Sequence, residues 1–130
     1  MKLRIHDNSI RLRLTRSEVA RFMTEGRIES TLQFGPDPSQ RLTYGLEAVP
    51  DIAALAVSGL AKRLIIQVPA AMAREWTGTE RVGIGAQQSI DGQGQVEILV
   101  EKEFRRLHGA KNNRDLYPNP LESTLTEHRV

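Results

Sequence analysis

Hydrophobic residues alternate strictly with charged or polar ones in two short segments near the start of the chain, KLRI and SIRLRL. A period of two residues is typical of β-strands and places the apolar side chains of both segments on one face. These apolar positions are Leu3, Ile5, Ile10, Leu12 and Leu14. The intervening HDNS contains Asp7 and Asn8, residue types that tolerate the left-handed backbone of a tight turn. We therefore expect a strand, a turn and a second strand that bury one apolar face.

The pattern changes to a helical period directly after these strands. TRSE matches a capping box, in which Thr15 and Glu18 satisfy each other's backbone N–H groups at the start of a helix. Val19, Phe22 and Met23 then share one helical face by their spacing, and Gly26 stands where a helix usually ends. RIESTLQF and RLTYGLE resume strand patterns on either side of the turn cluster GPDPSQ. The order strand, strand, helix, strand, strand follows.

The second part of the chain repeats this order with a constant shift of 54, so that residues 1–47 align with residues 55–101 without a gap. RLIIQV takes the place of SIRLRL, and Pro69 begins a second short helix. Arg81 and Val82 are expected to repeat Arg27 and Ile28 at the start of the next strand. One register across hairpin, helix and closing strand indicates an internal duplication.

Neither half is able to cover its apolar face alone, so two four-stranded halves packed face to face are expected to bury both faces. We predict a mainly β (α+β) fold. Its internally duplicated ββαββ units form an eight-stranded pseudo-two-fold barrel or sandwich with two short helices over its ends. Phe22 and Trp76 occupy corresponding helix positions, and we expect them to close the two ends of the core.

The domain organisation follows from the same alignment. Residues 1–104 are expected to form one duplicated domain, with the repeats 1–47 and 55–101 joined by the linker 48–54. Residues 105–130 have no counterpart and become polar, so we expect a C-terminal tail. Its candidate anchors to the body are Leu107, Leu116 and Tyr117.

The composition narrows the class of protein. With 130 residues, of which 39% are hydrophobic and 26% charged, the chain has the profile of one soluble globular domain. It has no cysteine, which removes disulfides and thiolate chemistry and favours a reducing, cytoplasmic location. No apolar run approaches the ~20 residues of a membrane helix, so no membrane partner is expected. The net charge of +2 permits a polyanionic partner without implying one.

The predicted element order, with DNSIRLRLT and LIIQVPAAMA at the strand-to-helix junctions, resembles the AbrB-like swapped-hairpin family of bacterial regulators and antitoxins. Members of that family build an eight-stranded body from two identical chains, so the resemblance implies a fused pseudo-dimer. Pro69 fits the family pattern after the second strand, whereas Thr15 departs from it. The hairpin FGPDPSQRLTYGLE is also longer than the family's usual final hairpin.

A second resemblance covers nearly the whole chain. The run from MKLRIHDNSIRLRLTRSEVARF through FGPDPSQRLTYGLE to ILVEKEF and YPNP is similar to a family of small uncharacterised bacterial proteins with an EKDF motif. Members often carry Cys two residues after the Phe of that motif, where this chain has Arg106. The resemblance implies no activity, and a thiol role is not available here.

The first hairpin carries four positive charges on the face away from the core. The turn at HDNS places Arg4 opposite Arg11 and Lys2 opposite Arg13, and like charges across a strand pair are unfavourable unless an anion relieves them. One interpretation is an ordinary salt-bridged surface, with Glu residues of neighbouring strands as partners. The other is a bound anion such as a phosphate backbone. The internal candidates are Glu47, Glu97 and Glu101.

The second half has different residues at the four matching positions, so the fold itself does not require these charges. They are Ala56, Ser58, Ile65 and Gln67. On the outward face of the second half Ile65 and Leu99 are apolar, which calls for cover by the tail or by a second subunit. Of the two, we expect the tail.

EILVEKEF places Glu97, Glu101 and Glu103 on one side of a strand. Three carboxylates in a row suit a divalent cation or acid–base chemistry, although a solvated face paired with the basic hairpin is the simpler interpretation. The three histidines lack metal-ligand spacing and are expected on the surface, and no cofactor or metal is expected. They are His6, His108 and His128.

Two functions from different classes remain. The first is a non-enzymatic interaction module that binds a protein or nucleic acid through the basic hairpin and the tail. The second is a cation-dependent enzyme or small anion-binding barrel that uses the Glu row, with Arg4 and Arg11 holding an anionic substrate. The first is preferred because no nucleophile or convergent acid–base set is recognisable. We expect a monomer built as a pseudo-dimer, with a homodimer as the alternative.

Overall fold

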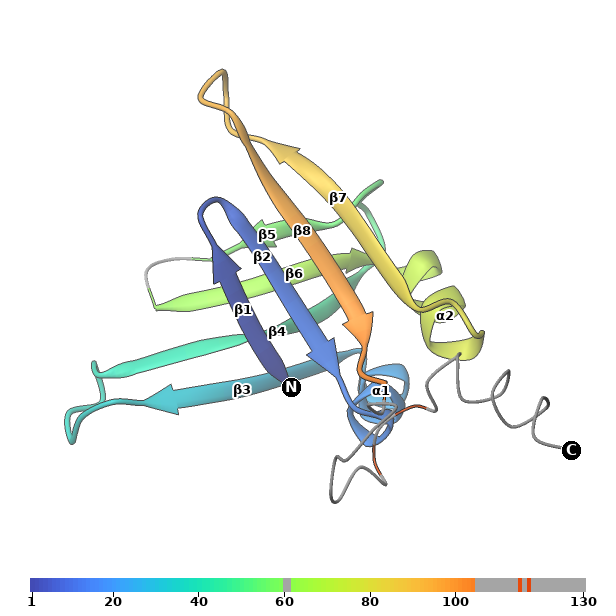
Figure 1. The fold of residues 1–130 in the computed structure, drawn as a ribbon, viewed down its shortest axis with the longest axis horizontal. Coiled ribbons are helices and arrows are strands. Elements are labelled where there is room, and N and C mark those ends of the chain that lie inside the picture. Colours follow the sequence, from blue (N-terminus) through green and yellow to red (C-terminus); the bar gives the residue numbers. More distant parts are fainter. Residues whose placement is uncertain (60–61, 105–114, 116, 118–130) are drawn as a thin grey trace, which may run out of the picture.

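The computed structural model describes residues 1–59, 62–104, 115 and 117. These residues form a mainly β protein with two helices (Figure 1). The elements are β1 (Lys2–His6), β2 (Ser9–Leu14), α1 (Arg16–Glu25), β3 (Arg27–Gln33), β4 (Arg41–Val49), β5 (Ala56–Ser58), β6 (Arg63–Pro69), α2 (Ala70–Gly78), β7 (Gly83–Ser89) and β8 (Gln95–Lys102).

The strands form two four-stranded sheets, which lie one in front of the other with their strands crossing (Figure 1). The first sheet has the order β1-β2-β8-β7 and the second has the order β3-β4-β6-β5. Each half of the chain therefore gives one hairpin to each sheet, whereas the sequence predicted one sheet per half. The exchange arises because β2 pairs in parallel with β8 and β4 with β6, which brings strands distant in sequence together.

Of the predicted barrel or sandwich, the closed barrel is wrong for the residues that the structure describes. In that part of the chain no ladder joins the first sheet to the second, so β1, β7, β3 and β5 remain edge strands. The two sheets cover each other's apolar faces as layers instead.

The ladders recur along the chain with the shift seen in the sequence. Leu3 pairs with Leu12, and the residues 54 positions later, Val57 and Ile66, pair in the same way. The parallel ladder of β2 with β8 likewise corresponds to that of β6 with β4. The two hairpin exchanges are thus equivalent in register.

The strand after the second helix departs from this shift. Ile84 is buried opposite Val100, as Ile28 is buried opposite Leu46, whereas Val82 is 39% exposed. The predicted match of Val82 with Ile28 is therefore wrong by two residues, and so is that of Arg81 with Arg27. Residues 79–82 separate α2 from β7, whereas Gly26 alone separates α1 from β3. A shorter hairpin before β8 compensates, so the gap-free alignment hid the difference.

The two helices lie side by side at one end of the sheets (Figure 1). Phe22 of α1 and Trp76 of α2 are both buried, with ring centroids 6.3 Å apart. Their assignment to the core is confirmed, but they close one end together and not the two ends separately. The first helix begins as predicted, since the Thr15 N–H donates to Glu18 Oε1 at 2.9 Å, and it ends at Gly26 with a left-handed φ of 70°.

Part of the C-terminal segment contacts the body. Tyr117 packs against the core, forms an isolated bridge with Phe104, and donates its N–H to the Glu103 carbonyl at 2.8 Å. The other expected anchors, Leu107 and Leu116, lie outside the described residues, as do His108 and His128. Neither α1 nor α2 combines the length and apolar character that a helix needs to cross a bilayer, and no other helix is described.

Candidate functional site

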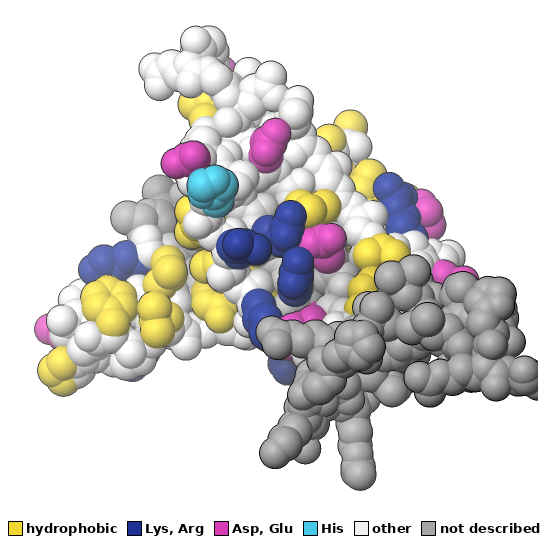
Figure 2. Space-filling model, viewed as in Figure 1, with side chains coloured by type: hydrophobic (Ala, Val, Ile, Leu, Met, Phe, Trp, Pro, Cys, Tyr) yellow, Lys and Arg dark blue, Asp and Glu magenta, His cyan; other side chains and the backbone are white. Residues whose placement is uncertain are grey.

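The outward side of β1 and β2 carries a basic face, which we define as Lys2, Arg4, Arg11 and Arg13. The two-residue turn at Asp7 sets the register as predicted, with Arg4 opposite Arg11 and Lys2 opposite Arg13. Asp7 adopts a positive φ of 47°, as expected for such a turn. In Figure 2 dark blue Lys and Arg side chains gather in the middle of the visible surface, with an acidic side chain among them.

Carboxylates of the neighbouring β8 neutralise part of this basic face. Arg11 Nε lies 3.3 Å and Arg13 Nε 3.7 Å from the same oxygen, Glu101 Oε1, because β2 pairs in parallel with β8. Lys2 forms an ion pair with Glu103. Among the described residues Arg4 has no carboxylate within ion-pair distance. Two guanidinium groups therefore share one carboxylate, and the third, that of Arg4, lies opposite Arg11 without one.

The contact of Glu101 with the arginines is a proximity of charges and not a directed hydrogen bond. Its Oε1 atom is buried, and none of the described residues donates a hydrogen bond to it, even though Arg11 Nε is 3.3 Å away. A short distance alone does not make a hydrogen bond, because hydrogen bonds weaken steeply when donor and acceptor are misaligned. The guanidinium N–H groups therefore keep donor capacity for an external anion.

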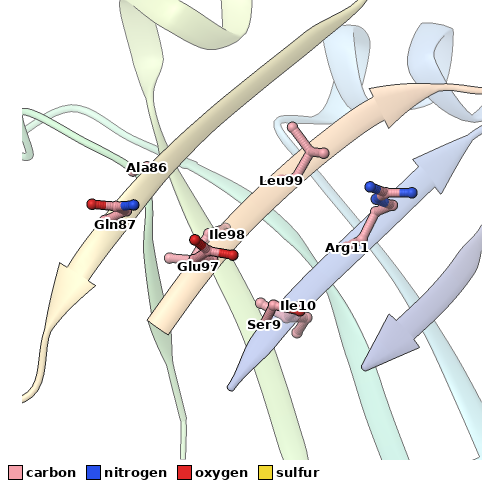
Figure 3. Close-up of a pocket in the computed structure, with 8 residues that line it drawn as sticks. All are labelled: Ser9, Ile10, Arg11, Ala86, Gln87, Glu97, Ile98 and Leu99. Carbon is pink, nitrogen blue, oxygen red and sulfur yellow. The ribbon is translucent and has the colours of Figure 1, made fainter. Parts of the chain in front are cut away.

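Shallow hollows lie over and beside the basic face. Three of them, of about 360, 380 and 400 Å³, all include Arg11 among their lining residues. Figure 3 shows the first, which runs from Arg11 across Leu99 and Glu97 of β8 to Gln87 of β7. On the outward side β7 carries Gly85 opposite Leu99, so β7 adds no side chain of its own there. The surface thus offers room for an extended ligand next to the arginines.

The outward side of the second sheet provides an internal comparison because its arginines are paired within the sheet. Arg63 lies 2.6 Å from Glu29, while Arg27 pairs with Glu29 and lies 4.0 Å from Glu47. Glu47 is therefore a partner of the second sheet and not of the basic face. Arg41 lies on the same side and donates from its Nε to Gln33 Oε1 at 2.6 Å. Each arginine of this side therefore has a partner within its own sheet, unlike Arg4 of the basic face.

The apolar residues expected on the outward face are not bare. Ile65, which corresponds to Arg11, is only 4% exposed, and Leu99 is half-buried. The predicted need for a tail or a second subunit to cover Ile65 is wrong. Its place in the central strand β6, between β4 and β5, already gives it neighbours on both sides.

The three carboxylates of the Glu row have separate surroundings. Glu101 contacts arginines, Glu103 lies one residue past the end of β8 and contacts Lys2, and exposed Glu97 is level with Ser9 of β2. In the part of the chain that was described, no three His, Asp or Glu side chains are grouped closely enough to hold a metal ion. Glu101 and Glu103, but not Glu97, supply counter-charges to the basic face. His6 is on the surface as expected, with its side chain 84% exposed.

Comparison with known proteins places the chain in a family. Residues 1–121 match the family described as "Family of unknown function (DUF7009)". The chain belongs to this family. No curated protein and no solved structure gives a significant match. The family description carries no activity, so roles for the residues of this member rest on its geometry.

Sequence reasoning missed one buried charge in this family member. Lys102 is 5% exposed, and its Nζ donates to the Thr79 carbonyl at 2.6 Å. The ammonium lies 5.8 Å from the ring centroid of Trp76 and 5.3 Å from that of Tyr117. Burial lowers the pKa of Lys102, and the Glu80 carboxylate partly opposes this effect. The sequence does contain a signal for this burial, because Lys102 lies two residues after the buried Val100 and so on the same face of the strand.

Proposed function

We propose that this protein is a non-enzymatic interaction module that binds an anionic partner through the basic face. The sharing of Glu101 by Arg11 and Arg13, next to Arg4, which has no carboxylate within ion-pair distance among the described residues, carries the proposal. Like charges opposite each other on a strand pair are destabilising, and an anion bound between them relieves the repulsion. The outward side of the second sheet supports it, because each arginine there has a partner within its own sheet.

A protein partner with an acidic segment fits this surface better than a nucleic acid. Nucleic-acid-binding domains usually present a long basic stripe on a strongly basic chain. This chain has a net charge of only +2. Three of the four cations of the basic face already contact a glutamate, and only Arg4 does not among the described residues. The remaining surplus matches a few carboxylates on a short segment.

The test measures binding of a fluorescein-labelled acidic peptide and of a random-sequence DNA duplex by anisotropy over a salt series. The double variant Arg4→Ala/Arg11→Ala should bind the preferred probe about tenfold more weakly, a loss of about 1.4 kcal/mol. Arg63→Ala is the matched control, since it removes one arginine from the outward side of the second sheet. Binding that is unchanged in the double variant, or that does not weaken with salt, overturns the proposal. The probe bound more tightly identifies the class of partner.

We also propose that the chain is a fused pseudo-dimer of two ββαββ units, related to AbrB-like swapped-hairpin proteins and located in the cytoplasm of a bacterium. The common shift of the ladders and the reciprocal exchange of hairpins support this origin. Superposition of residues 1–47 on residues 55–101 in an experimental structure should require a rotation near a half-turn. A superposition that fails over β2 and β6 would exclude the duplication.

A further inference from the structure

The two strands that begin the halves, β1 and β5, have edges of different character. At the edge of β5 the Val57 N–H donates to Gln88 Oε1 at 2.7 Å, and Gln88 Nε2 donates to the Val57 carbonyl at 3.4 Å. The amide of Gln88 thus pairs with this edge as a neighbouring strand would. Unpaired edges invite pairing with another chain, so this contact protects the second sheet.

The edge of β1 has no equivalent protection. His6 and Ser9 flank the two-residue turn and form the first hydrogen-bonded pair, so the backbone groups of Leu3 and Ile5 point away from β2. The backbone N–H and C=O of Val57, the counterpart of Leu3, likewise point away from the neighbouring strand β6. Within the described residues, no side chain or backbone group bonds to the outward N–H and C=O of Leu3 or Ile5.

Apolar surface lies uncovered beyond this free edge. Ile5, on the inner side of β1, is 57% exposed. Leu32 is 53% and Phe34 57% exposed on the β3–β4 hairpin, which projects past the edge of β1 (Figure 1). Figure 2 shows hydrophobic side chains gathered on this projecting hairpin. One more strand beside β1, at the usual spacing of about 4.8 Å, would extend the first sheet over this surface.

We propose that β1 is a β-augmentation site, at which an extended segment of a partner protein adds as a fifth strand to the first sheet. Alternate side chains of the segment are acidic and face Lys2 and Arg4, while those between them are apolar and lie towards Ile5 and the β3–β4 hairpin. The acidic requirement rests on the proposed function of the basic face. The main-chain pairing rests on the free edge alone.

Charge argues against a second copy of this chain as the occupant. Two β1 strands paired about a two-fold axis would bring Lys2 and Arg4 of one copy next to the same residues of the other, and like charges across strands are destabilising. A nucleic acid is also a poor match for this edge, because its sugar–phosphate chain has no alternating N–H and C=O groups and no apolar side chains. An acidic and apolar extended peptide satisfies all three features of the site.

The test uses an acetylated and amidated peptide of alternating Glu and Val, titrated against the full chain at low salt by NMR. Two versions of the peptide carry N-methyl groups on alternate amides, so that one version blocks the N–H groups facing β1 and the other blocks those facing solvent. The unmodified peptide should protect the Leu3 and Ile5 amides from exchange. One N-methylated version should lose affinity about tenfold and the other should not.

Protein variants provide the second arm. Ile5→Pro removes the outward N–H without touching a ladder bond to β2 and should weaken the peptide about tenfold, whereas Ile5→Thr keeps the N–H and a β-branched side chain and should not. Strand addition is overturned if Ile5→Pro binds the peptide as tightly as the wild type and both methylated peptides bind as tightly as the unmodified one. If binding then still depends on Arg4, the proposed function of the basic face stands. Binding of duplex DNA but not of the peptide overturns the inference, as does a wild-type dimer that Ile5→Pro converts to monomer.

Discussion

Phe22 of the first helix meets Trp76 of the second in an edge-to-face contact, with ring centroids 6.3 Å apart and an interplanar angle of 61°. Each half of the chain supplies one ring, and both are essentially excluded from solvent. The Trp76 indole N–H donates to the Val82 carbonyl at 3.1 Å, so its polar atom is satisfied. This pair joins α1 to α2 at the end of the sheets, and its two side chains are the largest fully buried ones among the described residues.

Truncation of Trp76 should therefore be severe. We expect Trp76→Ala to lower the free energy of unfolding by about 3–5 kcal/mol, because it leaves a cavity against Phe22. Trp76→Phe keeps an aromatic ring and should lose clearly less. Trp76 is the one Trp of the chain, so both variants lose Trp fluorescence and their urea unfolding is followed by circular dichroism. Equal losses in the two variants would show that packing against Phe22 contributes little.

Removal of a cation from the basic face should stabilise the protein. We expect Arg4→Thr to raise the free energy of unfolding by a few tenths of a kcal/mol, since it relieves repulsion with Arg11. Arg63→Thr, on the second sheet, should lower the free energy of unfolding by less than about 1 kcal/mol because it breaks the contact with Glu29. Both effects should shrink as salt is added to the urea titrations. A loss of stability in Arg4→Thr would indicate that Arg4 has an internal partner.

Asp115 fastens the C-terminal segment to the start of α1. Its carboxylate accepts hydrogen bonds from the Ser17 N–H at 2.9 Å and the Ser17 hydroxyl at 2.5 Å, and these bonds lower the pKa of Asp115. Asp115→Ala should cost about 0.5–1 kcal/mol near neutral pH, as for loss of a helix cap. A lowered pKa means that the contribution is complete above the unfolded value of about 3.9 and is lost as pH falls through the folded value. Urea titrations of both proteins should therefore converge in acid, and a constant difference would contradict the assignment.

The buried Lys102 predicts a pH dependence at the alkaline end. Burial lowers the pKa of Lys102, so between the folded value and the unfolded value of about 10.4 the unfolded state binds more protons and stability rises with pH. Lys102→Met fills the same volume and should abolish this rise. Lys62→Met, at an exposed position, should retain it. Chemical unfolding across the alkaline range measures the slope for each variant.

Two glycines make a matched pair for backbone crowding. A Cβ on Gly45 would lie 2.1 Å from the Ile28 carbonyl oxygen, so Gly45→Ala should separate β3 from β4 and cost more than about 2 kcal/mol. A Cβ on Gly78 meets nothing within 4 Å, and Gly78→Ala at the end of α2 should be neutral or stabilising by up to about 1 kcal/mol. Thermal unfolding of both variants distinguishes crowding from a general effect of the added methyl group.

Local patterns in the sequence predicted the elements and part of the site. Alternation over KLRI and SIRLRL, with a turn between them, was sufficient to place Arg4 opposite Arg11, because the length of a hairpin turn determines the register of its strands. The capping residues of TRSE likewise located the start of the first helix. These features depend only on residues a few positions apart, which is why a single sequence reveals them.

Which strands share a sheet was decided by the tertiary structure alone. Alternation shows that a strand has a buried face but does not encode its neighbour, so the sequence could not assign β8 to the side of β2 or Glu101 to Arg11 and Arg13. The two-residue offset at Ile84 was likewise not visible in the sequence, because the gap-free alignment conceals it. Only the pairing of Ile84 with Val100 reveals it. By itself the sequence determined the strands, the helices and the charged hairpin, since these depend on local periodicity. Long-range pairing, which depends on packing across the whole chain, determined their partners.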